Sequence, residues 1–293
     1  MPEEVKAGKA AENTAAPAKK TTRPDFATFG GLLLAVGGIV GGLLIEGGAI
    51  SDIAQYTAAI IVLGGTIGAV MVSMPMRVIT GAVKRFVGIF FEKASAPDEV
   101  VERLIDYASR ARRGGIVSLE QEADHITDPF LRKALNLAVD GTDLQELRRM
   151  LELEISLSEH HVEQEAKVFE SAGGYAPTVG IIGAVLGLIQ VMKNLSNIDE
   201  VGHGIAVAFV ATVYGVGVAN LLFLPAANKI KARAQEETQI RELILEGVVA
   251  IVEGLNPKLI RSKLEAFAHQ RQETKTEKTK KAPAAKAQLQ PGA

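Results

Sequence analysis

Four stretches of the chain contain no charged residue, and they form two pairs around a heavily charged middle. Their limits are 26–45, 53–76, 171–192 and 204–228. Each is long enough to cross a hydrocarbon core about 30 Å thick as a helix that rises about 1.5 Å per residue. The pattern predicts four transmembrane helices. Because none of them holds Asp, Glu, Lys, Arg or His, an ion-binding acid would have to come from elsewhere.

The rest of the sequence predicts helix, and no strand pattern competes. Pro97 and Gly114 bound one helix, and Asp128 followed by proline opens another. Thr142 is a candidate capping-box residue for a helix that continues without a breaker into the third span. Pro257 starts a short amphipathic helix, which we expect to pack on the cytoplasmic domain; a helix on the membrane surface is the alternative. The fold class predicted is an all-α membrane protein with a helical cytoplasmic domain between the second and third spans.

The charged flanks predict how the chain is oriented. Lys and Arg precede the first span and follow the second and fourth, so both termini and the middle domain should be cytoplasmic. We expect a multi-pass membrane protein, which the family resemblance described below implies to be one of the bacterial inner membrane. Its predicted parts are a disordered cytoplasmic arm (1–25), transmembrane helices 1 and 2 (26–76), a cytoplasmic helical domain (77–170), transmembrane helices 3 and 4 (171–228), a cytoplasmic helical extension (229–269) and a disordered tail (270–293).

Composition and motifs exclude several classes of function. The net charge of −2 argues against a nucleic-acid binder, and the absence of cysteine excludes disulfides and thiolate metal sites. There is no Gly-rich nucleotide-binding signature. His160 and His161 are adjacent, so they point to different faces of a helix and do not form a metal pair. We therefore expect no catalytic residues, no metal, no cofactor and no enzymatic activity.

Small residues and prolines distinguish the spans from ordinary apolar helices. Glycines four residues apart occur in three spans, as Gly37/Gly41, Gly38/Gly42, Gly64/Gly68 and Gly183/Gly187. Such spacing lets helices approach closely in lipid, either within one subunit or between subunits of a ring. Pro177 and Pro225 lie at similar depth near the cytoplasmic ends of the third and fourth spans. Each is either a static kink or a hinge.

Thr212 is a polar side chain in the middle of the fourth span. Its hydroxyl either bonds to the carbonyl four residues earlier, which is the usual arrangement for a membrane threonine, or faces an ion path.

The layout and four motifs resemble the MotA family of flagellar motor stator subunits, within the MotA/TolQ/ExbB superfamily. The motifs are IIVLGGTIGAVMVSMP (60–75), ARRGGIVSLE (111–120), YAPTVGIIGAVLGLI (175–189) and AVAFVATVYGVGVANLLFLP (206–225). The resemblance covers roughly residues 25–268. It implies an ion-conducting stator subunit that couples proton flow to torque on the rotor.

The resemblance also implies roles for individual residues. Arg112 and Glu120 match the charged pair that contacts the rotor protein FliG, and Pro177 and Pro225 match the coupling prolines. Thr212 matches the threonine that faces the ion path. Ala184 and Ala211 stand where sodium-driven relatives have threonine, which favours protons.

The partners implied are further copies of the chain, as a pentamer, and a MotB-type single-span peptidoglycan-binding subunit that supplies the ion-binding aspartate. Two alternatives stay open. One is a MotA-like motor for another load, such as gliding, envelope energisation or defence. The other is a membrane scaffold that transports nothing, which predicts tolerance of substitution at Thr212.

Overall fold

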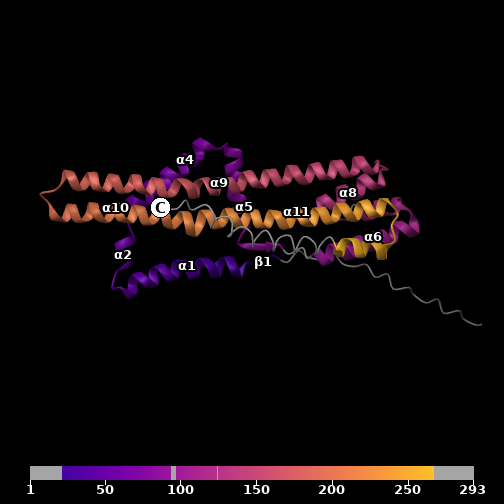
Figure 1. The fold of residues 1–293 in the computed structure, drawn as a ribbon, viewed down its shortest axis with the longest axis horizontal. Helices are drawn as coiled ribbons and strands as arrows, with labels where there is room; N and C mark the ends of the chain where they lie inside the picture. Colours follow the sequence, from indigo (N-terminus) through magenta and orange to yellow (C-terminus); the bar gives the residue numbers. More distant parts are fainter. Residues whose placement is uncertain (1–21, 94–96, 124, 267–293) are drawn as a thin grey trace, which may run out of the picture.

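A long antiparallel helical hairpin forms the axis of the computed structural model, which describes residues 22–93, 97–123 and 125–266. One arm is α9 (Leu144–Lys193), an unbroken helix of 50 residues. The other arm runs through α10 (Ile198–Val218), a π-helical turn η3 (Ala219–Phe223) and α11 (Leu224–Val252). Figure 1 shows these two arms side by side along the whole length of the molecule.

The other elements flank this hairpin. In chain order they are β1 (Thr22–Pro24), α1 (Phe26–Ile45), α2 (Ile50–Ile53), α3 (Tyr56–Ala59), η1 (Ile60–Gly64), α4 (Gly65–Ser73), α5 (Met76–Gly88), β2 (Phe91–Lys93), α6 (Pro97–Gly114), η2 (Ile116–Leu119), α7 (Glu120–Ala123) and α8 (Pro129–Val139). A last helix covers 257–266. Almost all of the described chain is therefore helical, as the sequence predicts.

The four spans predicted from the uncharged stretches are confirmed as helices long and apolar enough to cross a membrane. They are Phe26–Ile45, Ile50–Ser73 and parts of the two hairpin arms. Figure 1 shows α4 beside α9 and α1 on the opposite side of the hairpin. Within the described chain no residue of α1 is buried, whereas the second span holds buried Val62, Thr66 and Val70.

The largest apolar core lies at the end of the hairpin where α9 begins and α11 ends, in the domain predicted to be cytoplasmic. Helices α6, α7 and α8 pack there against the first part of α9 and the last part of α11. Fully buried side chains from each layer meet in this core, among them Leu104, Leu135, Leu147 and Val248. The core therefore forms from four separate parts of the sequence.

A second core lies at the middle of the hairpin, where the end of α4 and helix α5 pack against α9 and the start of α11. Helix α5 packs on the middle of α9, where the rings of Phe86 and Phe169 stack with their centroids 5.3 Å apart. Phe90 meets Phe86 edge-to-face at 5.5 Å, and Phe29 of α1 lies 5.4 Å from Phe90. Aromatic rings at these separations favour offset-stacked or edge-to-face arrangements. The stack connects the start of α1 to the middle of α9.

Two short strands depart from the helix-only expectation. Strands β1 and β2 pair antiparallel, with Thr22 opposite Lys93 and Pro24 opposite Phe91. Three residues are too few to show the alternation that marks a strand in sequence. Residues 22–25, expected in a disordered arm, therefore belong to the folded structure; 1–21 and 267–293 lie outside the described residues.

Helix starts were predicted with mixed success. Asp128 caps α8 by accepting hydrogen bonds from the backbone N–H groups of Phe130 and Leu131, as expected. The capping residue predicted at Thr142 is wrong by one position, because Asp143 caps α9 through the N–H of Gln145. A carboxylate is a strong acceptor for these N–H groups, so it takes the capping position from the neighbouring threonine.

The last helix packs on the cytoplasmic domain rather than lying apart from it, which confirms the first of the two alternatives. Ile260 and Leu264 are fully buried in the large core, while Leu259 remains 55% exposed. Glu246 of α11 receives hydrogen bonds from Arg148 (2.7 Å) and pairs with Lys263 of the last helix (3.0 Å).

The docking of the last helix is testable through matched leucines. Leu264→Ala should destabilise the protein by about 2–5 kcal/mol, because a fully buried leucine loses its contacts and leaves a cavity. Leu259→Ala on the same helix should change stability by less than about 0.5 kcal/mol, since that side chain is largely exposed. Thermal unfolding of the purified protein in detergent measures both, and equal shifts would contradict the docking.

Candidate ion path and coupling elements

The membrane parts of α9 and α10 approach so closely that glycine is required at their contact points. A Cβ atom at Gly187 would lie 2.8 Å from the carbonyl oxygen of Gly204, and one at Gly180 would lie 2.9 Å from that of Ala211. A Cβ atom at Gly215 would lie 2.6 Å from the carbonyl oxygen of Ala176. Real Cβ atoms do not approach carbonyl oxygens this closely, so the two backbones are in direct contact.

This contact shows that the spaced glycines of the third span pack within the subunit, whereas several glycines of the first and second spans face no other part of the described chain. Gly183 and Gly187 pack within the chain, against Ala211 and Ala208 respectively. By contrast, added Cβ atoms at the glycines of α1 and at Gly64 and Gly68 would meet nothing within 4 Å among the described residues. Backbone-to-backbone packing of the spans in this single chain therefore concerns the third and fourth spans, while the second span approaches the third through Gly65, whose added Cβ would lie 2.6 Å from the side chain of Val179.

The three residues predicted for the ion path lie near the middle of this contact but differ in exposure. Ala211 is fully buried, and a Cβ atom at Gly183 would lie 2.8 Å from its Cβ. Ala184 and Thr212 are partly exposed. The Thr212 hydroxyl donates to the carbonyl oxygen of Ala208 at 3.3 Å, which is the usual bond of a membrane threonine. The residue as a whole is nevertheless partly exposed on the hairpin surface.

Thr66 provides an internal comparison for Thr212. Its hydroxyl also donates to the carbonyl four residues earlier, that of Val62, at 2.6 Å. Thr66 is fully buried, so nothing outside the chain reaches it. The two threonines therefore differ in access rather than in their local hydrogen bonds.

The sequence interpretation missed a tyrosine contact beside Thr212. The phenol of Tyr214 donates to the carbonyl oxygen of Ile53, where α2 ends. Tyr214 also packs on the small core of Ala58, Val62, Val210 and Ala211. This contact fixes the N-terminal end of the second span against α10. A lone tyrosine in an apolar span was the available signal, because a buried phenol needs a hydrogen-bond partner.

The two predicted coupling prolines occupy different backbone settings on the two arms of the hairpin, and they do not lie at the similar depth that the sequence suggests: Pro177 follows Ala176, which faces Gly215, whereas Pro225 follows Leu224, which faces Gly173. Pro177 lies inside α9 without ending it, and it has no N–H for the carbonyl of Gly173. Pro225 lies in the first turn of α11, directly after the π-helical turn. A Cβ atom at Gly173 would lie 2.6 Å from Leu224, so both prolines flank one contact. A π-turn shifts the hydrogen-bond pattern and is frequent at functional sites.

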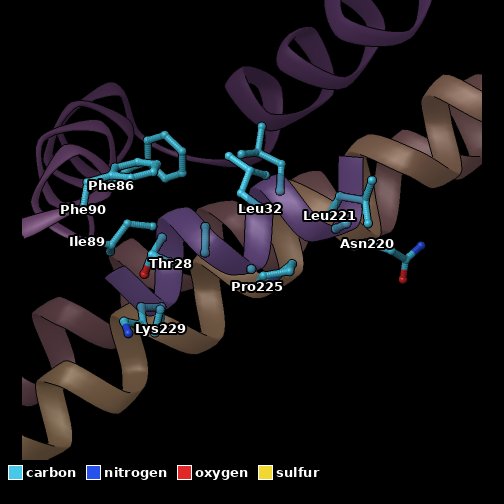
Figure 2. Close-up of a pocket in the computed structure, with 14 residues that line it drawn as sticks. Thr28, Leu32, Phe86, Ile89, Phe90, Asn220, Leu221, Pro225 and Lys229 are labelled. Atoms are coloured by element: carbon cyan, nitrogen blue, oxygen red, sulfur yellow. The ribbon is translucent and has the colours of Figure 1, made fainter. Parts of the chain in front are cut away.

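A cavity of about 330 Å³ lies beside Pro225, between α1, the end of α5 and the start of α11. Figure 2 shows its walls: Thr28 and Leu32 of α1, Phe86 and Phe90 near the end of α5, and Pro225 and Lys229 of α11. Most of the lining is apolar, and Lys229 stands at one end. Pro225 therefore borders open space on one side, whereas Pro177 lies within a continuous helix.

Asp25 supplies a buried carboxylate at the N-terminal end of α1, and the sequence interpretation gave it no role. It is 7% exposed. The ammonium group of Lys229, which hydrogen bonds to it, holds the pKa of Asp25 well below its usual range although burial opposes this shift. Its stabilising effect is therefore present above the ordinary aspartate pKa and is lost only in strong acid. A group that stays ionised near neutral pH is a poor carrier of protons.

Arg112 and Glu120 lie on the surface of the cytoplasmic domain. Both side chains are exposed, Arg112 in the last turn of α6 and Glu120 at the start of α7. Gly115 has a positive φ of 79°, which turns the chain between the two helices. Neither side chain forms an ion pair within the described parts of the chain. Both charges are therefore available to another molecule.

Comparison with known proteins assigns the chain to a family. Residues 29–113 match the model of the Motility protein A N-terminal region, and residues 122–243 match the MotA/TolQ/ExbB proton channel family. The Motility protein A of Bacillus subtilis (strain 168) is 36% identical over 241 residues, covering 82% of this chain and 89% of that protein. The chain belongs to the MotA family.

Other relatives agree with membership of the MotA family. The Chemotaxis protein PomA of Vibrio alginolyticus is 33% identical, covering 84% of this chain and 96% of that protein. The solved structure of C. jejuni MotAB has a TM-score of 0.79 at 32% identity, and covers 83% of this chain and 95% of that one. The flagellar MotAB stator complex from Bacillus subtilis has a TM-score of 0.77 at 35% identity, covering 82% and 95%.

The family described by the matching model is one of proton channels. Among residues 22–93, 97–123 and 125–266, no three His, Cys, Asp or Glu side chains gather as a metal site would require.

The backbone contact between α9 and α10 can be tested with two glycines on one helix. Gly215→Ala should separate the helices, because its Cβ would lie 2.6 Å from the carbonyl oxygen of Ala176. Gly217→Ala is the matched control, since its Cβ would meet nothing within 4 Å. We expect Gly215→Ala to lower the unfolding temperature in detergent and Gly217→Ala to preserve it. A greater loss from the control would refute the contact.

Proposed function

We propose that this chain is the ion-conducting stator subunit of a bacterial flagellar motor, which couples proton flow to torque on the rotor. The observation that carries the proposal is the hairpin of α9 and α10, packed through glycine, with a partly exposed Thr212 and a proline on each arm. Membership of the MotA family supports the same function.

The proposal places the chain in the inner membrane as an oligomer around a partner helix. Both termini and the middle domain are cytoplasmic, because Lys and Arg flank the spans on that side. Five copies surround a MotB-type subunit. The open glycines of α1 and the open Gly64 and Gly68 of the second span support contacts between copies, since close helix packing in lipid uses small residues.

The ion-binding carboxylate comes from the MotB-type partner in this mechanism. The four uncharged spans hold no acid, and Asp25 stays ionised. Protonation of a partner aspartate removes its charge in a low-dielectric site and changes what it binds. One proton crossing about 150 mV supplies roughly 3.5 kcal/mol, which is enough to bias a two-state helix arrangement.

Movement reaches the rotor through the cytoplasmic domain. Pro225 and the π-turn provide the joint, while α9 and α11 run from the membrane into the cytoplasmic core. Arg112 and Glu120 are the exposed charges that engage FliG. Electrostatic contacts of this kind favour rapid and reversible association.

Loss of swimming tests the ion path and the coupling. Thr212→Ala and Pro177→Leu should each abolish swimming and leave membrane levels unchanged, because neither side chain fills the core. Thr66→Ala is the matched control, since it removes a hydroxyl with the same local bond from a site with no access. Cells carrying the control should swim. Normal swimming with both Thr212→Ala and Pro177→Leu would refute the mechanism.

The choice of ion can be tested by removing the proton gradient or the sodium and measuring swimming speed. Ala184 and Ala211 offer no hydroxyl ligands, and a dehydrated sodium ion needs several oxygen atoms. Swimming speed should fall with a protonophore and stay constant when sodium is removed. Dependence on sodium with indifference to the protonophore would reverse the assignment to protons.

A further inference from the structure

The Asp25 carboxylate joins three segments that lie far apart in the sequence. Its Oδ1 atom caps α1 by accepting from the N–H groups of Ala27 (3.1 Å) and Thr28 (3.2 Å). Its Oδ2 atom receives Lys229 at 2.6 Å and Arg233 at 2.9 Å, both from α11. Its own N–H donates to the carbonyl oxygen of Phe90 at 3.0 Å.

Arg233 completes the connection on the α11 side. The same guanidinium donates to the carbonyl oxygens of Gly88 (2.6 Å) and Phe91 (2.7 Å), where α5 ends and β2 begins. Lys229 and Arg233 are four residues apart, so they lie on one face of α11. The start of α1, the α5–β2 connection and α11 are thus held by one network, which we call the Asp25 network: Asp25, Lys229, Arg233 and the backbone oxygens of 88, 90 and 91.

The Asp25 network lies directly beyond the joint of the coupling arm. Lys229 follows Pro225 by four residues and shares its face of α11. Both residues line the cavity in Figure 2, together with Thr28 of α1. A bend at Pro225 therefore moves α11 immediately at the point where the network ties it to α1 and α5.

A joint transmits force only if the segment beyond it has a fixed point to turn about. A buried carboxylate with two cationic partners is suited to this task, because breaking the pair leaves an uncompensated buried charge. We propose that Asp25 is a positioning residue for torque generation: through Lys229 and Arg233 it fixes the pivot about which α11 turns when the Pro225 joint bends. This proposal rests on the proposed function of Pro225.

The experiment separates torque from assembly. In cells whose motors regain stator units one at a time, rotation speed rises in steps; step size measures the torque of each unit, and step number measures how many units assemble. Asp25→Asn keeps a side-chain acceptor for the cap but removes the charge. We expect smaller speed steps at an unchanged step number and an unchanged membrane level of the protein.

Asp128→Asn is the matched control. Asp128 also caps a helix through two N–H groups, at 2.9 and 3.3 Å, and forms no ion pair within the described residues. This variant should give steps of full size. A milder second variant, Lys229→Gln, leaves the Arg233 pair in place and should reduce the step size less than Asp25→Asn. The double variant, Asp25→Asn with Lys229→Gln, should reduce the step size no more than Asp25→Asn alone, because both changes act on one contact.

Full-sized steps for Asp25→Asn would overturn the proposal. Fewer steps of full size would overturn it as well, since Asp25 would then only support folding or assembly. Full-sized steps for Pro225→Leu would instead refute the coupling role of that proline and hence the proposed function. The two failures are therefore distinguishable in one assay.

Discussion

Direct contact between the backbones of α9 and α10 is the constraint on which the rest of this structure depends. Gly180, Gly187 and Gly215 have no room for a side chain, because each faces a main-chain atom of the opposite helix. Lipid tails are as apolar as the side chains, so helix association in a membrane relies on this close packing rather than on the hydrophobic effect. The contact fixes the register of the two arms, which in turn places Ala211 against Gly183 and Gly173 beside Leu224.

Much of the helical framework could be predicted from sequence, because the relevant signals are local. The absence of charge over about 20 residues identifies each span, and Asp128 followed by proline identifies the start of α8. The strands at Thr22–Pro24 and Phe91–Lys93 could not be predicted, since each is three residues long and gains its hydrogen bonds only from a partner about 70 residues away. Pairing between two short segments so far apart in the sequence produces no periodic pattern in either of them.

The candidate site was predictable in its parts but not in its connections. Thr212 and the two prolines stand out as unusual residues in apolar helices, and resemblance to a family gave them roles. The contacts of Asp25 with Lys229 and Arg233 join residues more than 200 positions apart, and a lone aspartate before an apolar run suggests only a helix cap. In the same way, the bond from Tyr214 to Ile53 depends on how α2 ends, which no pattern in the sequence states.

The unbroken length of α9 has a mechanical consequence. At about 1.5 Å per residue, 50 residues make a rod of roughly 75 Å that borders the candidate ion path at one end and joins the large apolar core at the other. Its companion arm carries the π-turn and Pro225. In the proposed mechanism, a bend at Pro225 beside this long helix converts a small change of tilt near the membrane into a larger sideways displacement at the far end.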